Sequence, residues 1–493
     1  MGDSSAFLAI DIGAGSGRAV VGRLTEGRLE LEEVHRFDSL AVRTSDGLYV
    51  DVLSLHREIV RSIQLALEVA PIVSLGIDTW GVTCAVLDRG MALLGNPVFY
   101  RDERVVGTAE RVYATLPKER LYAMTGVQEL PFNTGFMLNA LQAGGHLDGA
   151  AHVLMLPDAL ALLLTGTAMV ERTNASTTQL YDPRQRTWSA DAIAGMGLDP
   201  QWFTLPFVDP GMVIGETAAS VLPQAAHRPR VIAVGSHDTA SAVVAVPAIG
   251  HGWSYISCGT WSLIGVERAT PVLTAEAMAS NVTNEVGVDD TIRLLRNVSG
   301  LWLLQESQRW WASQSLSRSH QDMVDLAEGA VPLGSLFDPD DPSLLAPGDM
   351  PSRVRALCAR HGEPVPGTDG ALIRAMLEST ALRYNEVLDR IAQVTGEQID
   401  TVHIVGGGSK NRLLCQLTAD ACRRTVVAGP AEATAIGNIL VQARAAGLVS
   451  DLATMREVVR ASFPVEHYLP AADQLPWERA RARFAQLPGR VSL

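Results

Sequence analysis

The sequence has few cysteines, and none of them stands in a metal-binding or redox pattern. None of the five forms a CxxC pair, and Cys415 and Cys422 are seven positions apart on an expected helix. Seven helical residues rise by roughly 10 Å, which is too far for a disulfide. The cysteine pattern therefore predicts a protein without a zinc or dithiol site that remains reduced.

The sequence also lacks a secretion signal and a membrane-spanning run. Residues Met1–Ser5 are polar and show no basic segment followed by an apolar one. The most apolar run, Val153–Thr165, contains Pro157 and Asp158 and is shorter than the roughly 20 residues that a spanning helix needs. We interpret this run as a buried helix and expect a cytoplasmic protein.

Positive charge is scarce. The chain has 40 basic and 54 acidic residues, a net charge of −14, which argues against a nucleic-acid partner because nothing offsets the repulsion of the phosphates. Apolar residues make up 47% and charged residues 19%, as in a soluble globular protein. A chain of 493 residues is too long for one core, so we expect two domains, 1–246 and 247–493, with the boundary near Pro247.

One stretch near the middle of the chain combines a buried strand with a polar turn. Val231–Val234 is an apolar, β-branched run, and a helical pattern of small residues begins at Thr239. Asp238 then lies exposed at the mouth of a helix, beside free backbone N–H groups. Such a carboxylate can take a proton from a substrate hydroxyl, or it can simply cap the helix. Taken alone, the stretch favours the cap.

The first glycine-rich turn follows a strand at Phe7–Ile12 and reads Asp-Ile-Gly-Ala-Gly-Ser-Gly-Arg from Asp11 to Arg18. The next two segments, Arg18–Leu24 and Leu29–Phe37, alternate with period two and predict a hairpin. A dinucleotide-binding fold would place a helix here and a third glycine where Arg18 stands. We therefore interpret the turn as an anion nest, to which Arg18 adds a fork of donors for phosphate.

The second half begins in a similar way. Strands are expected at Trp253–Ser257 and Trp261–Glu267, with the small-residue turn Cys258–Thr260 between them. Two such turns facing each other would hold the phosphates of one nucleotide from two sides. Gly406–Gly408 follows a further strand, Val402–Val405, and either lets an adenosine lie against bare backbone or forms a tight βα turn.

The rest of the chain alternates between helical and strand patterns. In the first half of the chain, we expect a hairpin of Cys84–Leu87 with Met91–Leu94 and a polar loop at Thr173–Thr178. We also expect helices at Asp51–Val69, Leu301–Ala312 and Gly370–Thr395 and a strand at Ile72–Ile77.

Taken together, these motifs resemble the FGGY carbohydrate kinases, and within that family the kinases of L-rhamnulose. The resemblance runs nearly from end to end in the family's order. The matching stretches include IDIGAGSGR at 10–18, GIDTWGV at 76–82, TNASTTQL at 173–180, GSHDTASAV at 235–243, SCGTWSLIG at 257–265, HIVGGGSKNRLL at 403–414 and GPAEATAIGNI at 429–439.

The resemblance implies an α/β protein with the two-domain actin/Hsp70-like ATPase (ribonuclease H-like) fold and an active-site cleft between the domains. It implies ATP and Mg²⁺ as cofactors and phosphorylation of the 1-hydroxyl of L-rhamnulose in rhamnose catabolism. The expected partners are the sugar and ATP, with no nucleic acid and no membrane, in a monomer or homodimer.

The resemblance also implies roles for single residues. Asp238 matches the catalytic base. Asp11 matches the carboxylate that helps to hold the magnesium-bound phosphates, with an indirect contact to Mg²⁺. The nucleotide contacts would be Ala14, Gly15, Ser16, Gly17, Arg18, Thr260, Gln305, Gly407 and Asn411, with Asp11 among them. The sugar contacts would be Gly81, Thr83, His237, Thr239 and Asn297.

Two departures concern the sugar side. Thr83 stands where the family usually has an aspartate, and Val286 replaces a glycine of the family's usual NEGG. A kinase of another ketose, such as L-fuculose, xylulose or ribulose, is therefore an alternative. Two other classes are a non-catalytic ATPase switch of the same fold and an NAD-linked oxidoreductase. The base in the 235–243 stretch argues against the first, and Arg18 followed by a hairpin argues against the second.

Overall fold

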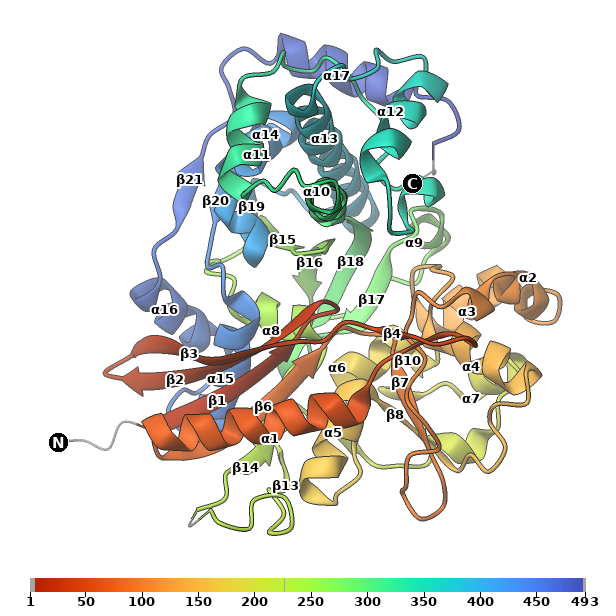
Figure 1. Ribbon diagram of the computed structural model, residues 1–493, viewed down its shortest axis with the longest axis vertical. Coiled ribbons are helices and arrows are strands. Elements are labelled where there is room, and N and C mark those ends of the chain that lie inside the picture. The colour runs from red at the N-terminus through yellow and green to blue at the C-terminus, as the bar shows by residue number, and fades with distance from the viewer. Residues whose placement is uncertain (1–4, 226, 491–493) are drawn as a thin grey trace. The chain divides into compact units, whose positions relative to one another are not determined.

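The computed structural model describes residues 5–225 and 227–490, which form two compact units (Figure 1). Unit 1 contains the chain up to Pro247 together with Glu267–Leu294 and Ala433–Phe463. Unit 2 contains Ala248–Val266, Leu295–Glu432 and the chain from Pro464 onward. Each unit is therefore assembled from segments that are distant in sequence.

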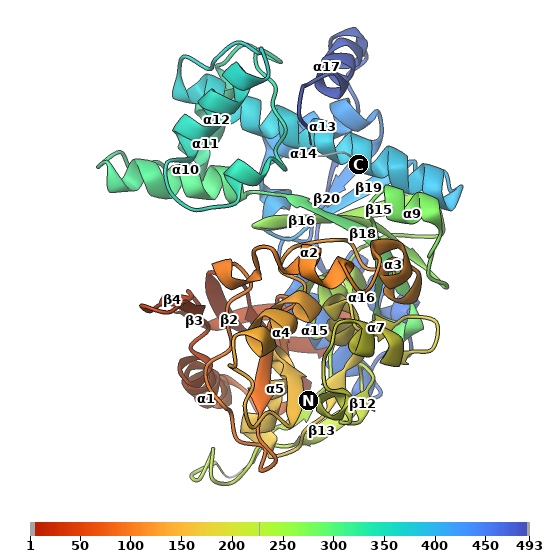
Figure 2. The same cartoon turned by 90° about the vertical axis from the view of Figure 1, so that its right-hand side faces the viewer.

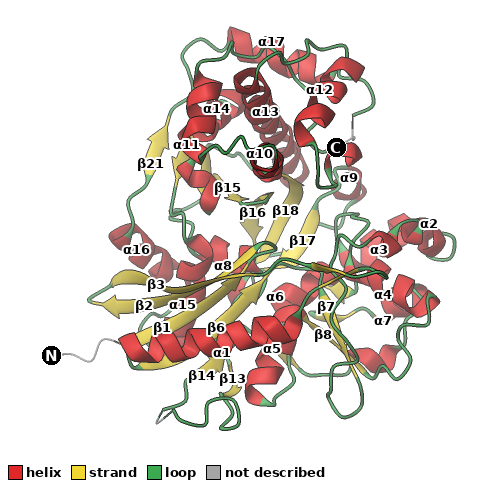
Figure 3. Ribbon diagram, viewed as in Figure 1, coloured by secondary structure: helices red, strands yellow, loops and turns green. Residues whose placement is uncertain are grey.

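The main sheet of unit 1 has six strands in the order β13-β14-β6-β1-β2-β3 (Figure 3). Strands β1, β2 and β3 form an antiparallel meander, which confirms the hairpin expected after the first glycine turn, and β6 and β14 continue the sheet parallel to β1. The strands span Ser5–Ile12 (β1), Ser16–Thr25 (β2), Arg28–Asp38 (β3), Ile72–Thr79 (β6), Val213–Glu216 (β13) and Arg230–Ile232 (β14).

The parallel strands end together, and this fixes the place of the polar motifs. Asp11 on β1 is in register with Asp78 on β6, and Thr79 forms a bridge with His237, just beyond β14. In open α/β sheets, ligands bind outside the carboxyl ends of such strands. Residues from three separate sequence motifs thus meet at one edge of the sheet of unit 1.

Helices cover both faces of this sheet (Figure 1). One face packs on α1 (Val52–Val69) and α5 (Leu156–Thr165), and the other packs on α8 (Asp238–Val244) and α15 (Ala433–Ala445). Asp51 caps α1, since its side chain accepts a hydrogen bond from the backbone N–H of Ser54. The two helices α8 and α15 lie side by side although nearly two hundred residues of chain separate them.

The expected hairpin at 84–94 is wrong in its second strand. Strand β7 (Cys84–Leu87) pairs with β8 (His152–Met155). Met91–Leu94 is not a strand, although it folds back on β7 through the bridge between Leu87 and Leu93 and a hydrogen bond from the N–H of Leu94 to the carbonyl of Val86. The turn itself forms, because the Asp88 side chain accepts hydrogen bonds from two later backbone amides. The more apolar β8 is the better buried partner for β7.

Two further sequence interpretations are corrected. Val153–Thr165 is not one helix: its beginning lies in β8, and α5 begins at Leu156 with Pro157 in its first turn, where proline is tolerated. The polar loop expected at Thr173–Thr178 is also wrong. The segment forms the short helix α6 (Arg172–Ala175) and a 3-10 turn (Ser176–Thr178), and all six residues are buried.

Unit 2 is organised around a second sheet, with neighbouring strands in the order β18-β16-β15-β19-β20-β21 (Figure 3). The antiparallel pair β15 and β16 confirms the second strand–turn–strand motif. The long helix α13 (Asp369–Thr395) begins after the cap Thr368 and ends at Gly396, which has a positive φ. The strands span Trp253–Cys258 (β15), Trp261–Arg268 (β16), Ile292–Ser299 (β18), Thr401–Val405 (β19), Thr425–Ala428 (β20) and Glu466–Tyr468 (β21).

Further helices and short strands complete the two units, and many of them are labelled in Figure 2. No helix in the part of the chain that the structure describes is long and apolar enough to cross a membrane. The other helices are α2 (Thr108–Tyr113), α3 (Lys118–Thr125), α4 (Thr134–Ala143), α7 (Ala190–Gly195), α9 (Ala275–Ala279), α10 (Trp302–Ser313), α11 (His320–Glu328), α12 (Met350–Arg360), α14 (Arg412–Cys422), α16 (Leu452–Ser462) and α17 (Leu475–Ala485). The short strands are β4 (Val42–Arg43), β5 (Leu48–Tyr49), β9 (Val170–Glu171), β10 (Tyr181–Asp182), β11 (Thr187–Trp188), β12 (Phe207–Val208) and β17 (Thr283–Val286).

Candidate active site

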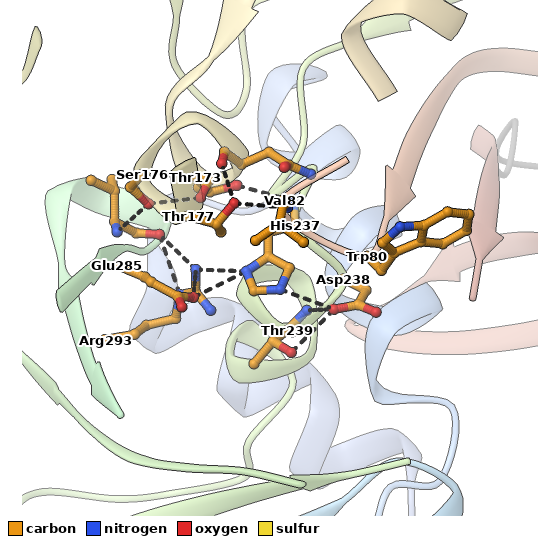
Figure 4. A network of polar contacts seen from close by, with 12 residues as sticks. Trp80, Val82, Thr173, Ser176, Thr177, His237, Asp238, Thr239, Glu285 and Arg293 are labelled. Atoms are coloured by element: carbon orange, nitrogen blue, oxygen red, sulfur yellow. Dashed lines mark hydrogen bonds and ion pairs between the residues drawn. The ribbon is translucent and has the colours of Figure 1, made fainter. Parts of the chain in front are cut away.

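Asp238 is the first residue of α8, and its carboxylate is held from one side only (Figure 4). Its Oδ1 accepts hydrogen bonds from the backbone N–H and the hydroxyl of Thr239, and it lies 3.4 Å from Nε2 of His237. No residue in 5–225 or 227–490 forms a hydrogen bond or ion pair with Oδ2, and the side chain is 31% exposed. The carboxylate is thus oriented through one oxygen only.

The charge of Asp238 is set by opposing effects. Burial raises the pKa of this carboxyl, whereas His237 and the bonds from Thr239 lower it, and the charge of Asp11 raises it again. The net shift of the pKa is upward. Asp238 is therefore a stronger base than an ordinary surface aspartate, and His237 is the main group that opposes its protonation.

The loop that carries His237 is anchored by a buried glutamate that the sequence analysis did not single out. Glu171 accepts hydrogen bonds from the backbone N–H groups of Thr173, Asn174 and Ser236. It also accepts from the hydroxyls of Thr173 and Ser236. The hydroxyl of Thr173 in turn accepts a bond from the backbone N–H of His237. Glu171 thus satisfies the donors at the start of the 173–178 stretch. The later hydroxyls, of Ser176, Thr177 and Thr178, donate to backbone carbonyls three residues earlier, so the whole stretch can be buried.

The chain after β6 passes close to the same site. Val82 has a φ of 62°, which is unusual for a β-branched residue, and its N–H donates to Thr177. A side chain at Gly81 would meet Thr177 at 3.0 Å, so the backbone approaches that threonine closely. Thr83 is 2% exposed, and its hydroxyl accepts a hydrogen bond from the indole N–H of Trp80 at 2.8 Å. Its oxygen is therefore engaged inside the protein.

The first glycine turn forms a tight, partly exposed bend. The N–H of Gly13 donates to the carbonyl of Ser16, and Gly15 and Ser16 are exposed while Ala14 is half-buried. A side chain at Gly17 would collide with the ring of Phe37, so glycine is required there. Arg18 donates two N–H groups to Oδ2 of Asp11, at 2.9 and 2.7 Å. Arg18, which is expected to bind phosphate, is thus paired with Asp11, which is expected to lie near the magnesium ion.

Asp78 is a second acidic residue at the strand ends that the sequence analysis missed. It is fully buried, its Oδ2 accepts a hydrogen bond from the amide of Asn438 at 2.6 Å, and its Oδ1 has no hydrogen-bond partner among the described residues. Burial and the neighbouring charge of Asp11 raise its pKa well above the ordinary value. The motif GIDTWGV contained the signal, since an aspartate ending an apolar strand beside another strand-end aspartate predicts a close acidic pair.

In unit 2, two of the expected nucleotide residues contact each other. The hydroxyl of Thr260, in the turn between β15 and β16, donates to the side-chain oxygen of Gln305 on α10 at 3.1 Å. The backbone N–H of Trp302 donates to the carbonyl of Thr260, which joins the turn to the start of α10. Both Thr260 and Gln305 remain partly exposed.

The triple glycine lies against the same turn. A side chain at Gly408 would collide with Cys258, so the loop after β19 packs directly on the turn after β15. Gly407 is exposed, with open space where a side chain would stand. Asn411 caps α14 by accepting from the backbone of Leu414. Unit 2 thus brings together Thr260, Gln305 and Gly407, whereas Asn297 lies half-buried on β18.

Asp11 is the residue expected on the magnesium side of the site. No group of three or more potential metal ligands occurs among the described residues. Mg²⁺ in kinases is usually bound by one or two carboxylates, water and the phosphates of the nucleotide, and does not need a cage built by the protein alone. Asp11 at the edge of the sheet is compatible with such a site.

Comparison with known proteins assigns nearly the whole chain. The N-terminal domain of the FGGY family of carbohydrate kinases matches residues 6–245, and the C-terminal domain of that family matches residues 254–446. A rhamnulokinase from Bacteroides thetaiotaomicron is 41% identical over 489 residues, which cover 97% of this chain and 98% of the relative. A rhamnulokinase from Enterococcus faecalis is 40% identical and covers 94% of both chains.

Solved structures agree on the fold. A gluconate kinase from Lactobacillus acidophilus superimposes with a TM-score of 0.79 at 14% identity, covering 98% of this chain and 97% of its own. A glycerol kinase from Plasmodium falciparum, solved with ADP, gives a TM-score of 0.76 at 18% identity, with 98% and 97% coverage. At these identities the likeness concerns the fold, and it confirms the expected two-domain kinase architecture.

Proposed function

Because this chain belongs to the FGGY family of carbohydrate kinases, we propose that it transfers the γ-phosphoryl group of ATP to the 1-hydroxyl of L-rhamnulose. The relatives at about 40% identity over nearly the full length support this choice of sugar. Membership in this family leaves no place for the oxidoreductase and chaperone-like alternatives that the glycine turn and the fold had suggested.

The observation that carries the proposal is the one-sided support of Asp238. Thr239 and His237 both lie at Oδ1, while Oδ2 is left by the described residues for a hydroxyl group. A carboxylate in this arrangement can accept a hydrogen bond from the primary hydroxyl of a sugar and then take its proton. General base catalysis of this kind contributes about 10²- to 10⁴-fold to a rate.

The proposed reaction keeps a simple balance of atoms. The hydroxyl oxygen forms a bond to the γ-phosphorus as the bond to the bridging oxygen of ATP breaks, and the hydroxyl proton passes to Asp238. Phosphoryl transfer proceeds through a loose transition state, so the chain acts mainly by positioning and by neutralising charge. Asp238 orients the hydroxyl and receives the proton late.

The other assignments follow the same division of the chain. On unit 1, Gly81, His237 and Thr239 would surround the sugar, whereas Thr83 would lie behind them with its hydroxyl bonded to Trp80. The turn Ala14–Gly17 with Arg18 would contact phosphates. On unit 2, Thr260, Gln305, Gly407 and Asn411 would contact the nucleotide and Asn297 the sugar. Asp11 would help to hold Mg²⁺, which when bound neutralises the charge of the phosphates.

A substrate panel tests the proposal. The purified protein is assayed with ATP, Mg²⁺ and each of L-rhamnulose, L-fuculose, L-xylulose and L-ribulose, with ADP release as the readout and phosphorus NMR to locate the new ester. We expect the highest kcat/KM with L-rhamnulose and a 1-phosphate product. Higher kcat/KM with another ketose, or an ester at another carbon, would replace the proposed substrate while retaining the family assignment.

A further inference from the structure

A buried ion pair lies on the far side of His237 from Asp238 (Figure 4). Glu285 on β17 and Arg293 on β18 are 3.1 Å apart, with side chains that are 5% and 0% exposed. Both lie against the same ring nitrogen: Nδ1 of His237 is 3.1 Å from Oε2 of Glu285 and 3.2 Å from Nη2 of Arg293. The opposite nitrogen, Nε2, faces Oδ1 of Asp238.

We propose that Glu285, supported by Arg293, is a positioning residue for phosphoryl transfer that holds the His237 ring with Nε2 directed at Asp238. The inference rests on the proposed function, since it concerns the base of that reaction. Neither residue touches the position where a substrate hydroxyl would meet Asp238. Their effect passes through the imidazole.

The two partners hold Nδ1 in different ways. The guanidinium of Arg293 donates to Nδ1, and Oε2 of Glu285 lies within ion-pair distance of the same nitrogen without a hydrogen bond to it. Together they restrict rotation of the ring. A surface histidine without such partners would rotate freely and would not keep Nε2 beside the base.

The ion pair is itself fixed by the backbone. Arg293 donates from Nε and Nη2 to the carbonyl of Val286, and the N–H of Val286 donates to the hydroxyl of Ser176. The contact uses the main chain at position 286. It therefore survives the replacement of the family's usual glycine by valine. Through Ser176, β17 is attached to the buried polar turn that lies next to the sugar-side residues of unit 1.

The electrostatic balance favours a permanently charged Glu285. Burial raises the pKa of this carboxyl, but Arg293 and His237 outweigh the burial, and the net shift is downward. Glu285 is therefore anionic beside His237, and His237 is the group that most lowers the pKa of Asp238. Two further acidic residues lie near Asp238: Asp11 on β1, whose charge raises the pKa of Asp238, and Asp78 on β6, whose own pKa is raised well above its ordinary value by burial and by Asp11.

The decisive variant is Glu285→Gln, which keeps the shape and removes the charge. Without the anion, the ring loses one of the two groups that hold Nδ1 and no longer keeps Nε2 beside Asp238. The group that most lowers the Asp238 pKa is then displaced, so Asp238 binds its proton more readily and the acidic limb of the kcat pH profile should move to higher pH. We expect kcat to fall by roughly ten- to a hundredfold, the range for one lost interaction with a charged group. The KM for ATP should stay close to that of the wild type.

Glu378→Gln is the matched control. Glu378 is a buried glutamate on α13 that also pairs with an arginine, Arg374, at 2.7 Å, but it lies in unit 2 and has no contact with a histidine. Both variants should lose some thermal stability, whereas only Glu285→Gln should move the acidic limb. Glu285→Asp keeps the charge, so its acidic limb should lie close to that of the wild type. It also serves as the test should Glu285→Gln fail to fold.

A readout without activity separates this inference from the proposed function. Histidine-selective ¹⁵N labelling reports the protonation and tautomer of each ring, and the His237 signals are assigned by their loss in His237→Gln. We expect the His237 nitrogen shifts to change between wild type and Glu285→Gln, and not between wild type and Glu378→Gln. Unchanged shifts together with an unmoved acidic limb would overturn the inference. A wild-type protein that phosphorylates no ketose, yet shows the expected shifts, would overturn only the proposed function.

Discussion

Asn438 on α15 donates its side-chain amide to the buried carboxyl of Asp78 on β6, across 360 positions of sequence. The same helix extends the contact, because Gln442 donates to Asn438 and to the carbonyl of Leu8, and accepts from Ser74. A buried chain of polar groups thus attaches α15 to the two central strands of unit 1. Such networks specify one arrangement of packed elements when each member is satisfied.

The raised pKa of Asp78 predicts a distinct dependence of stability on pH. In the folded protein this carboxyl keeps its proton above pH 4, whereas in the unfolded chain it ionises near its ordinary value of about 3.9. The folded state then binds more protons, so stability decreases as pH rises from the unfolded pKa toward the raised folded pKa. Asp78→Asn is neutral at every pH and removes this loss.

We therefore expect the urea midpoint of Asp78→Asn to increase relative to wild type as pH rises from 4.5 to 7.5. The exposed Asp148, changed to asparagine, is the control and should show no such trend. A difference between Asp78→Asn and wild type that stays constant over this pH range would mean that Asp78 is ionised in the folded protein.

Much of this architecture could be predicted from the sequence, because local rules determine it. Period-two alternation and the Glu26–Gly27 turn predict the hairpin of β2 and β3, and the Asp51 and Thr368 caps predict the starts of α1 and α13. The apolar run Val231–Val234 and the helical pattern from Thr239 likewise predict Asp238 at the start of a helix. Each of these features depends on residues that are close together in the chain.

The features that the sequence analysis missed depend on distant partners. Thr173–Thr178 contains turn-forming polar residues, and the carboxylate of Glu171 that holds its start also binds Ser236, 65 positions later. The main partner of β7 is β8, about seventy residues later in the chain, whereas the segment after its own turn adds only the bridge between Leu87 and Leu93. No local pattern reveals which partner wins, because the choice depends on burial in the finished unit.

Glu171 should therefore be a major source of stability. Replacement by glutamine introduces an NH₂ group where the carboxylate now accepts bonds from Thr173, Asn174 and Ser236. Breaking a buried, charge-assisted network of this kind costs about 3–5 kcal/mol. We expect a large fall in the urea midpoint of Glu171→Gln. The exposed Glu216, changed to glutamine, should have almost no effect, and equal midpoints for the two variants would contradict the assigned role.

Thr83 gives a prediction about the sugar. Its hydroxyl is buried and occupied by the indole N–H of Trp80, so Thr83→Val leaves that donor unpaired and should cost about 1–3 kcal/mol of stability. Because the hydroxyl is already engaged, the order of preference among the four ketoses should not change. A reordered preference in kcat/KM, with stability retained, would show that Thr83 contacts the sugar directly.

Thr260 gives a prediction about the nucleotide. Thr260→Val removes the hydroxyl that donates to Gln305 and, in the proposed function, contacts a phosphate. Loss of one such bond should weaken ATP binding by roughly tenfold or more, while sugar binding to unit 1 is retained. Calorimetry with ATP and with the sugar in separate titrations distinguishes the two effects. Loss of sugar affinity alone would place Thr260 on the wrong ligand.

Asp238→Asn tests the base itself. The substitution keeps the oxygen that accepts from Thr239, so the start of α8 should remain folded, but it removes the group that takes the hydroxyl proton. We expect kcat to fall by about 10²- to 10⁴-fold with ATP affinity nearly unchanged. In the wild type, the raised pKa of Asp238 places the loss of activity on acidification above the pH at which an ordinary aspartate protonates, and this acidic limb should be absent from the residual activity of the variant. Turnover close to that of the wild type would reduce Asp238 to a residue of the first turn of α8, and the acceptor of the proton would have to be sought elsewhere at this edge of the sheet.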